Sequence, residues 1–327
     1  MIKMSKLNQF YYPHKPIASL DKLANCLGLS LSELRYLQKY SDKFFFLQSR
    51  KKKSDGSVRK IYDVRDRLKH VHEKIVQRFF KILDYPEYLQ GGIKKRDHKS
   101  NARKHLNKKM IIQEDVKNFF PAISKKIIYQ IWIGFFHFSH EVSDCLTELV
   151  TYRGHLVQGS KVSGFLCNLI WWRREARLAS LLKKKGFVYT RFVDDVCVSS
   201  NKEINNKEKQ EIIGKIYSLF SSVEARPNRR KHKIMHKGNR QSVNNLNVSK
   251  TRPTLSKEKR NNIRAAVFQC EQEFNLEKST YKYKKKWWCP KMYADKRRAN
   301  KKQRRHGIFE VWKLKIPFAV PVAVGRI

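Results

Sequence analysis

The stretch Val188-Tyr-Thr-Arg-Phe-Val-Asp-Asp-Val-Cys-Val-Ser-Ser200 places two adjacent carboxylates, Asp194 and Asp195, between two short apolar runs of β-forming residues. This pattern predicts a β-hairpin with the acids at its tip. Two like charges side by side are costly to hold together unless a divalent cation neutralises them. An isolated Asp-Asp pair is commonly a solvated turn, so the metal interpretation needs support from elsewhere in the chain.

A third carboxylate lies upstream in Ile111-Ile-Gln-Glu-Asp-Val-Lys-Asn-Phe-Phe-Pro121, where a β-forming start runs into Asp115 and two aromatic residues before a proline. Asp115 and Asp194 together predict a two-metal site. Two Mg²⁺ ions about 3.5–4 Å apart, or Mn²⁺ in their place, can activate a primer 3′-hydroxyl and hold a triphosphate for in-line attack. The predicted chemistry is nucleotidyl transfer.

Three segments resemble motifs A, B and C of reverse transcriptases, in the same order and with similar spacing. They are Asp115-Val-Lys-Asn-Phe-Phe-Pro121, Leu156-Val-Gln-Gly-Ser-Lys-Val-Ser-Gly164 and Phe192-Val-Asp-Asp195. Asn101-Ala-Arg-Lys-His105 is similar to an element that precedes motif A in bacterial retron-type and defence-associated reverse transcriptases of the group II intron-like superfamily. The resemblance implies an α+β right-hand polymerase with fingers, a palm of antiparallel sheet plus helices, and a helical thumb.

The resemblance also assigns roles around the metals. Asp194 is expected to be the ligand shared with Asp115, whereas Asp195 is expected further from the metals, because consecutive strand residues point to opposite sides. The backbone of Val116 often completes a metal shell in the family. The candidate metal ligands are therefore Asp115, Val116, Asp194 and Asp195.

Contacts to the incoming nucleotide are expected from two segments. Lys53-Ser-Asp-Gly-Ser-Val-Arg-Lys-Ile61 resembles a fingers element that sets basic side chains over the triphosphate. Arg59 is the first candidate, since a guanidinium can hold phosphate oxygens bidentately, and Lys53 is a weaker one. A solvated basic hairpin is the alternative. In motif B, Gln158 and Gly159 are expected close to the nascent base pair.

Two details of the motifs bear on substrate choice. Phe120 lies five residues after Asp115, where reverse transcriptases place a ring beneath the sugar, so deoxynucleotides are the expected substrate. Phe119 is predicted to be core, because alternation along a strand sends neighbouring residues to opposite faces. Motif B departs from the family, since residues 157, 161 and 164 are not the usual prolines, which predicts a more mobile loop.

Asn228-Arg-Arg-Lys-His-Lys-Ile234 resembles motif D, in which a lysine acts as general acid for the leaving pyrophosphate. Lys231 matches that lysine by position, and a plain phosphate contact is the alternative. Val243-Asn-Asn-Leu-Asn-Val248 stands where retron enzymes usually carry Val-Thr-Gly. The candidate primer and template contacts are Phe192, Asn101, His105, Asn244 and Leu246. His105 is not expected to be a metal ligand, and a hydrogen-bonding role within the Asn-Ala-x-x-His element is favoured for it.

The composition predicts a nucleic-acid partner. The chain has 72 Lys and Arg against 28 Asp and Glu, a formal charge of +44 on 327 residues, which repels itself unless a polyanion covers it. No run of about 18 apolar residues and no signal peptide is present, so we expect no membrane contact. Six cysteines without a Cys-x-x-Cys pair indicate reduced thiols in a cytoplasmic protein.

The C-terminal segment alternates aromatic and basic residues, from Tyr281-Lys-Tyr-Lys-Lys-Lys-Trp-Trp288 to the basic stretch 296–305. Aromatic rings among positive charges suit stacking on unpaired bases while phosphates are held. A solvated basic helix is the alternative. The candidate RNA-binding residues are Lys284, Lys285, Trp287, Trp288, Tyr293, Arg297, Arg298, Arg304 and Arg305.

The predicted organisation is an N-terminal helix and fingers at 1–109, a palm with motifs A to D at 110–240, and a primer-grip-like segment, thumb and RNA-binding region at 241–327. A thumb stripe of Ile263, Val267, Cys270 and Phe274 is expected to be core. The predicted function is an RNA-directed DNA polymerase that copies a cognate structured noncoding RNA into DNA for antiphage defence, with a toxin or other effector, or a second copy, as further partner. The alternatives are a defence enzyme making repetitive, untemplated or protein-primed DNA, and a non-catalytic RNA-binding scaffold.

Overall fold

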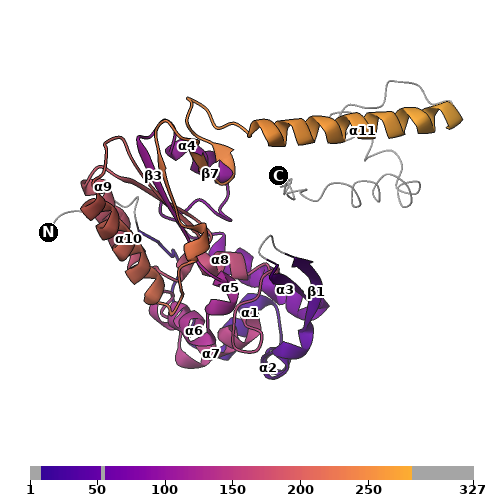
Figure 1. Cartoon of the computed structure of the whole chain (residues 1–327). Coiled ribbons are helices and arrows are strands. Elements are labelled where there is room, and N and C mark those ends of the chain that lie inside the picture. Colours follow the sequence, from indigo (N-terminus) through magenta and orange to yellow (C-terminus); the bar gives the residue numbers. More distant parts are fainter. Residues whose placement is uncertain (1–8, 53–55, 282–327) are drawn as a thin grey trace. The chain divides into compact units, whose positions relative to one another are not determined.

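The computed structural model describes residues 9–52 and 56–281, and the chain divides into two compact units, 1–254 and 255–327 (Figure 1). The first unit is a mixed fold of helices around a four-stranded sheet. All neighbouring strands in this sheet are antiparallel. The strand order is β4 (Val188–Phe192), β5 (Asp195–Ser200), β3 (Met110–Asp115) and β6 (Lys233–His236).

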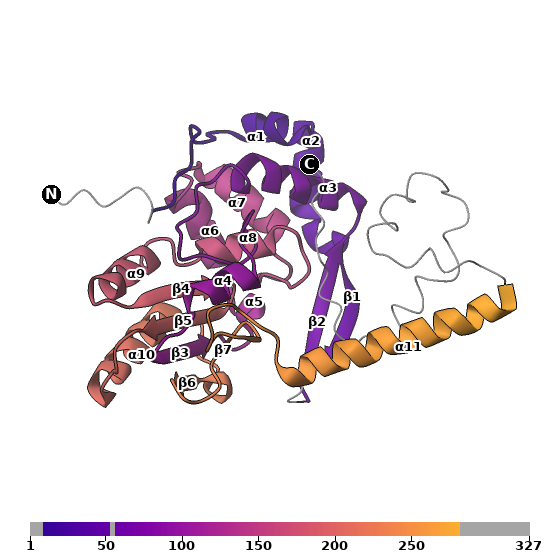
Figure 2. The ribbon, with the colours of Figure 1, turned by 90° about the horizontal axis from the view of Figure 1, so that it is seen from above.

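One face of this sheet is covered by two helices, α9 (Glu175–Lys184) and α10 (Asn206–Ser221), which lie on the same side of the strands in both views (Figures 1 and 2). α10 is the longer of the two helices, with 16 residues against 10. Its start is fixed by a capping box in which Asn205 and Glu208 bond each other's backbone. Alternation along β3 and β5 sends the even-numbered residues Ile112, Val196 and Val198 into this main core.

The opposite face carries a second, smaller apolar cluster. Its sheet members include Ile111 and Cys197, and it is closed by α4 (His98–Lys104) and by the two-stranded hairpin of β7 (Ser242–Val243) and β8 (Leu246–Asn247). This cluster covers the end of the face where β3 begins. Asp115 lies four positions after Ile111 on β3, and side chains alternate along a strand, so both are on this face. The carboxylates therefore lie at the other end of the same face.

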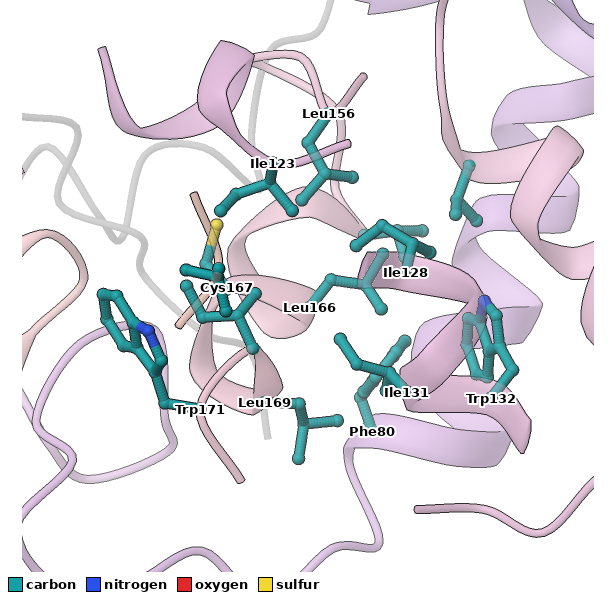
Figure 3. Close-up of a cluster of buried hydrophobic side chains, with 14 of the residues drawn as sticks. Phe80, Ile123, Ile128, Ile131, Trp132, Leu156, Leu166, Cys167, Leu169 and Trp171 are labelled. Atoms are coloured by element: carbon teal, nitrogen blue, oxygen red, sulfur yellow. The ribbon is translucent and has the colours of Figure 1, made fainter. Parts of the chain in front are cut away.

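A helical layer packs beside the sheet. It comprises α3 (Asp66–Ile75), its π-helical continuation η3 (Val76–Phe80), α5 (Phe119–Ala122), α6 (Lys125–Gly134), α7 (His140–Val150) and α8 (Ser163–Leu169). Figure 3 shows that Ile131 of α6 and Leu166 of α8 point toward each other in its core. α3 and η3 follow each other without a break, from Asp66 to Phe80.

The N-terminal part contributes α1 (Leu20–Leu27) and α2 (Leu31–Lys39), and Ser30 and Glu33 form a capping box at the start of α2. After a 3₁₀ turn (Ser41–Phe44) come β1 (Phe45–Lys52) and β2 (Val58–Val64), which form an antiparallel hairpin separate from the central sheet (Figure 2). The hairpin is fastened to the segment before α8, because the Tyr62 N–H donates to the Gln158 carbonyl at 2.8 Å.

The second unit contains α11 (Lys257–Tyr281). Ile263 is 52% exposed and Val267 is 41% exposed on this helix, so the prediction that they are core is wrong in the described structure. Local helical spacing identified the stripe but could not show whether another element covers it. Across the described residues, no helix combines the length and apolarity needed to cross a membrane.

Candidate active site

Three carboxylates meet at one end of the two central strands of the sheet, β3 and β5. Asp115 ends β3, Asp195 begins β5, and the strand register sets them directly opposite each other. Asp194 belongs to the two-residue turn between β4 and β5, so the predicted hairpin is present with the acids at its tip. One carboxylate oxygen from each of the three residues lies within 4.8 Å of the others.

Asp195 was expected further from the metals than Asp194, and in this structure its carboxylate lies in one cluster with those of Asp115 and Asp194. Asp195 shares a face of the sheet with Asp115, because residues paired across antiparallel strands point to the same side. The expectation treated 194 and 195 as successive strand residues, whereas Asp194 is in the turn. The geometry therefore groups all three side chains.

Burial and mutual repulsion make this cluster unfavourable when it is fully ionised. Burial, and then the neighbouring charges of Asp194 and Asp115, raise the pKa of Asp195 to about 8. Burial and the charge of Asp115 also raise the pKa of Asp194. A divalent cation would remove this penalty, and three carboxylates are the hard oxygen ligands that Mg²⁺ and Mn²⁺ prefer. The donor set thus fits a metal centre.

The 3₁₀ turn Arg229–Lys231 brings a cation to the same place. The Asp115 carboxylate accepts hydrogen bonds from Asn228 Nδ2 at 2.9 Å and from Lys231 Nζ at 2.9 Å. Burial opposes the charge on Lys231, but the contact with Asp115 outweighs it and raises the pKa of the ammonium. Lys231 therefore stays protonated at neutral pH and contacts the carboxylate cluster.

Glu114 is a site residue that the sequence analysis did not identify. Its buried carboxylate points away from Asp115 and accepts hydrogen bonds from His232 Nδ1 at 2.6 Å and from Tyr217 of α10 at 3.2 Å. Burial raises the pKa of Glu114. The contact holds the turn that carries Lys231 against the back of β3. The Glu-Asp pair at the strand end was the available signal, since alternation sends the two acids to opposite faces.

The β1–β2 hairpin and the segment before α8 approach the site together. Gly159 has φ of +117°, and a Cβ there would lie 2.0 Å from the carbonyl oxygen of Tyr62, so only glycine fits this contact. Arg59 of β2 is close enough to Asp194 for its charge to lower the pKa of that carboxyl. Lys53 lies outside the described residues. The charge of Arg59 thus acts on the carboxylate end of the sheet, and Gln158 and Gly159 contact the hairpin that carries it.

Comparison with known proteins identifies the family. The family described as reverse transcriptase (RNA-dependent DNA polymerase) matches residues 50–283. The chain is 34% identical to the retron Se72 reverse transcriptase of Salmonella heidelberg (strain 579083-10), over 86% of this chain and 75% of that protein. The chain belongs to the retron-type reverse transcriptases. It is also 28% identical to the retron Ec48 reverse transcriptase of Escherichia coli, over 81% of this chain and 67% of that protein.

Among solved structures, this reverse transcriptase is similar to an apo telomerase from Candida tropicalis, with a TM-score of 0.42 and 10% identity. The match covers 74% of this chain and 56% of that telomerase, so the chain spans little more than half of its length. A telomerase from the same species truncated from its C-terminal domain gives a TM-score of 0.41 over 70% of this chain and 61% of that one.

The aromatic residues of motif A in this reverse transcriptase lie in a helix, not a strand. Asn118, with φ of +49°, ends the extended segment, and Phe119 and Phe120 open the short α5. Phe119 is buried against Trp171, whereas Phe120 is only partly buried. The prediction that Phe119 is core is confirmed, but its stated cause is wrong, because the two residues are consecutive in a helix and their side chains point about 100° apart. Phe192 is also partly exposed beside the acids.

Two candidate primer contacts prove to be buried. His105 is fully buried, with Nδ1 2.7 Å from Ser199 Oγ and Nε2 2.7 Å from Thr190 Oγ1. Burial lowers the pKa of His105 to about 3, so its ring is neutral. Leu246 packs in the small apolar cluster. These side chains do not face a nucleic acid in this structure. They hold α4 and the β7–β8 hairpin onto the sheet.

Asn101 is likewise buried, and its Nδ2 donates to Asn244 Oδ1 at 2.6 Å. Asn244 is partly exposed and has φ of +47° in the β7–β8 turn. The Asn-Ala-x-x-His element therefore acts as a brace between α4, the turn and the sheet. The candidate RNA-binding residues Lys284, Lys285, Trp287, Trp288, Tyr293, Arg297, Arg298, Arg304 and Arg305 lie outside the described residues.

Proposed function

We propose that this reverse transcriptase extends a primer with deoxynucleotides by a two-metal mechanism at Asp115, Asp194 and Asp195. The observation that carries the proposal is the convergence of three carboxylate oxygens within 4.8 Å on one face of the sheet. Bound divalent cations, Mg²⁺ or Mn²⁺, would activate the primer hydroxyl and neutralise the triphosphate. The raised pKa values of Asp194 and Asp195 support the proposal, because three buried carboxylates disfavour full ionisation and a bound cation would reverse this.

The surrounding residues provide the other elements of the reaction. The carbonyl of Val116, next to Asp115, is proposed to complete a metal shell. Lys231 is protonated beside the carboxylates and is proposed to donate a proton to the leaving pyrophosphate. Arg59 extends from the exposed basic hairpin toward Asp194 and is proposed to hold the triphosphate. Phe120 is proposed to lie beneath the sugar and exclude a 2′-hydroxyl.

We further propose that the template is a structured noncoding RNA made with the protein, that the product is DNA, and that the pair serves antiphage defence together with an effector. The support is the family and the charge of +44, which suits a polyanion partner. In the right-hand terms of the polymerase, β1–β2 would be fingers, the central sheet palm and α11 thumb. Sequencing the nucleic acid that copurifies tests this, since a single RNA-linked DNA species is expected and a homopolymer would contradict it.

Catalysis is tested by primer extension with the wild type and with Asp194→Ala combined with Asp195→Ala. We expect extension to be lost. Asp144→Ala is the matched control, because it removes an exposed carboxylate from α7, away from the cluster. Both variants should bind RNA as the wild type does. Equal extension by wild type and the double variant would leave only an RNA-binding scaffold.

A further inference from the structure

A buried arginine stands directly behind the carboxylate hairpin. Arg191 of β4 and Glu175 of α9 are both completely buried and form a two-point ion pair. Nε of Arg191 donates to Glu175 Oε1 at 2.6 Å and one terminal nitrogen donates to Oε2 at 2.8 Å. Tyr189 also donates to Oε1, at 2.7 Å. A buried pair of this kind rarely adds net stability over apolar side chains, so its presence calls for another explanation.

The rest of the guanidinium is directed at backbone carbonyls on two elements. The terminal nitrogens donate to the carbonyls of Cys167 at 3.1 Å and Asn168 at 3.0 Å, near the end of α8, and to the carbonyl of Val193 at 2.9 Å. With the two bonds to Glu175, all five guanidinium N–H groups have a partner. Arg191 therefore joins the helix that follows motif B to the turn that carries Asp194.

That turn needs support. Val193 has φ of +58°, although it is β-branched and occupies the first central position of a two-residue hairpin, where a turn with positive φ at that position usually has glycine. Such backbone persists only where the surroundings dictate it. Here the carbonyl of Val193 is held by Arg191, and the preceding strand is held from the side by the main chain of 88–90.

A second contact confines the same turn from another direction. A Cβ on Gly91 would lie 2.7 Å from Cγ2 of Val193 and 2.8 Å from its backbone nitrogen, so this glycine permits a close approach that alanine would not. The Gly91 carbonyl accepts from Asn168 Nδ2 at 2.9 Å. Gly91 and Arg191 thus both lie against Val193, and both are hydrogen-bonded to α8.

We propose that Arg191, held in place by Glu175, is a positioning residue that sets the carboxylates of Asp194 and Asp195 for metal binding and ties their position to α8. The inference rests on the proposed function of the three aspartates as the metal site. Arg191 touches no reacting atom in this arrangement. It acts through the carbonyl of Val193, one residue before Asp194, and it couples the loop at Gln158 and Gly159 to the metal centre through α8.

The test uses the purified full chain and follows Mn²⁺ binding by electron paramagnetic resonance, alongside primer extension. Arg191→Lys keeps a charge for Glu175, but one ammonium cannot reach all the carbonyls that the fork holds. We expect Mn²⁺ affinity to weaken by roughly 10–100-fold, as when the partners of metal ligands are removed. Extension should fall in kcat, while KM for the deoxynucleotide changes by less than about threefold.

Gly91→Ala tests the same turn without disturbing the buried charges. If Arg191→Lys does not fold, Gly91→Ala alone tests whether the position of the turn controls metal binding. It should also weaken Mn²⁺ binding. Gly214→Ala is its matched control, because a Cβ there meets nothing within 4 Å, and it should bind Mn²⁺ as the wild type does. Leu34→Ala, a core truncation in α2, controls for lost stability alone.

The outcomes separate the two levels of the proposal. If Asp194→Ala binds Mn²⁺ as tightly as the wild type, the metal site itself is wrong. If Asp194→Ala loses binding while folded Gly91→Ala and Arg191→Lys both retain wild-type affinity, only the positioning role is overturned. If Leu34→Ala weakens Mn²⁺ binding as much as Gly91→Ala, the effect is one of general stability and the positioning role is also overturned.

Discussion

Replacing Gly159 with alanine should push the β1–β2 hairpin away from the segment before α8. The new Cβ would lie 2.0 Å from the carbonyl oxygen of Tyr62 and 3.0 Å from Cγ2 of Ile61. An ordinary contact begins near 3.4 Å, so β2 must retreat by roughly 1.4 Å. A movement of this size also breaks the hydrogen bond from the Tyr62 N–H to the Gln158 carbonyl.

The magnitude follows from these contacts. A residue with a Cβ at φ of +117° costs about 1–3 kcal/mol, and the lost hydrogen bond costs about 1 kcal/mol. We expect the free energy of unfolding to fall by about 2–4 kcal/mol. Because the hairpin carries Arg59, KM for the deoxynucleotide should rise more than kcat falls.

Urea unfolding followed by tryptophan fluorescence measures the first effect, since Trp132 and Trp171 are buried in the core beside α8 (Figure 3). Steady-state primer extension measures the second. Gly214→Ala, in the middle of α10 with open space around it, should leave both quantities unchanged or stabilise slightly. Stability within about 0.5 kcal/mol of wild type for Gly159→Ala would show that the close approach to β2 does not exist.

Three further outcomes are expected. Burial lowers the pKa of His72 to about 4 and of His105 to about 3, from 6.5 when exposed. The contribution of these two neutral rings to the free energy of unfolding is therefore fully present above about pH 6.5. It falls by about 1.4 kcal/mol per pH unit for each ring as the pH drops toward 4. Equal urea midpoints at pH near 7 and near 5 would contradict this. Phe120→Ala should raise the ratio of ribonucleotide to deoxynucleotide incorporation in primer extension by at least about tenfold. An unchanged ratio would show that the Phe120 ring does not lie beneath the sugar. Arg59→Ala should raise KM for the deoxynucleotide about tenfold. Lys60→Ala should not, because the Lys60 side chain points to the opposite side of β2. Equal effects of the two substitutions would show that only the net charge matters.

The local parts of the site were predictable from sequence. Alternating apolar residues on both sides of Asp194 and Asp195 predict a hairpin, and the structure has it. Asp115 at the end of a β-forming run predicts a strand end, and the family order of motifs predicts that the two meet. The hairpin and the strand end depend on spacing within about ten residues, which a sequence shows directly, whereas the meeting of Asp115 with Asp194 was expected from the family resemblance.

The long-range parts were not predictable. Glu114 and His232 are far apart in sequence, and nothing local indicates that they pair. His105 was assigned to primer binding because residue type does not reveal burial, which only the packing of α4 determines. Arg191 gave a signal that could have been used, since a charged residue within an apolar strand needs a buried partner, but the sequence offers no means of selecting Glu175.

The register of β3 with β5 links the core to the carboxylate site. Because side chains alternate, a slip of one residue would turn Asp115 toward the apolar layer under α10 and move Glu114 to the opposite face. Glu114 would then lose its hydrogen bonds from Tyr217 and His232, and the Asp115 carboxylate would be buried in the apolar layer without partners. The pairing that satisfies Glu114 is the same pairing that sets Asp115 opposite Asp195. The hydrogen bonds that Glu114 makes on one face of the sheet therefore help to fix, on the other face, the position of Asp115, the proposed metal ligand.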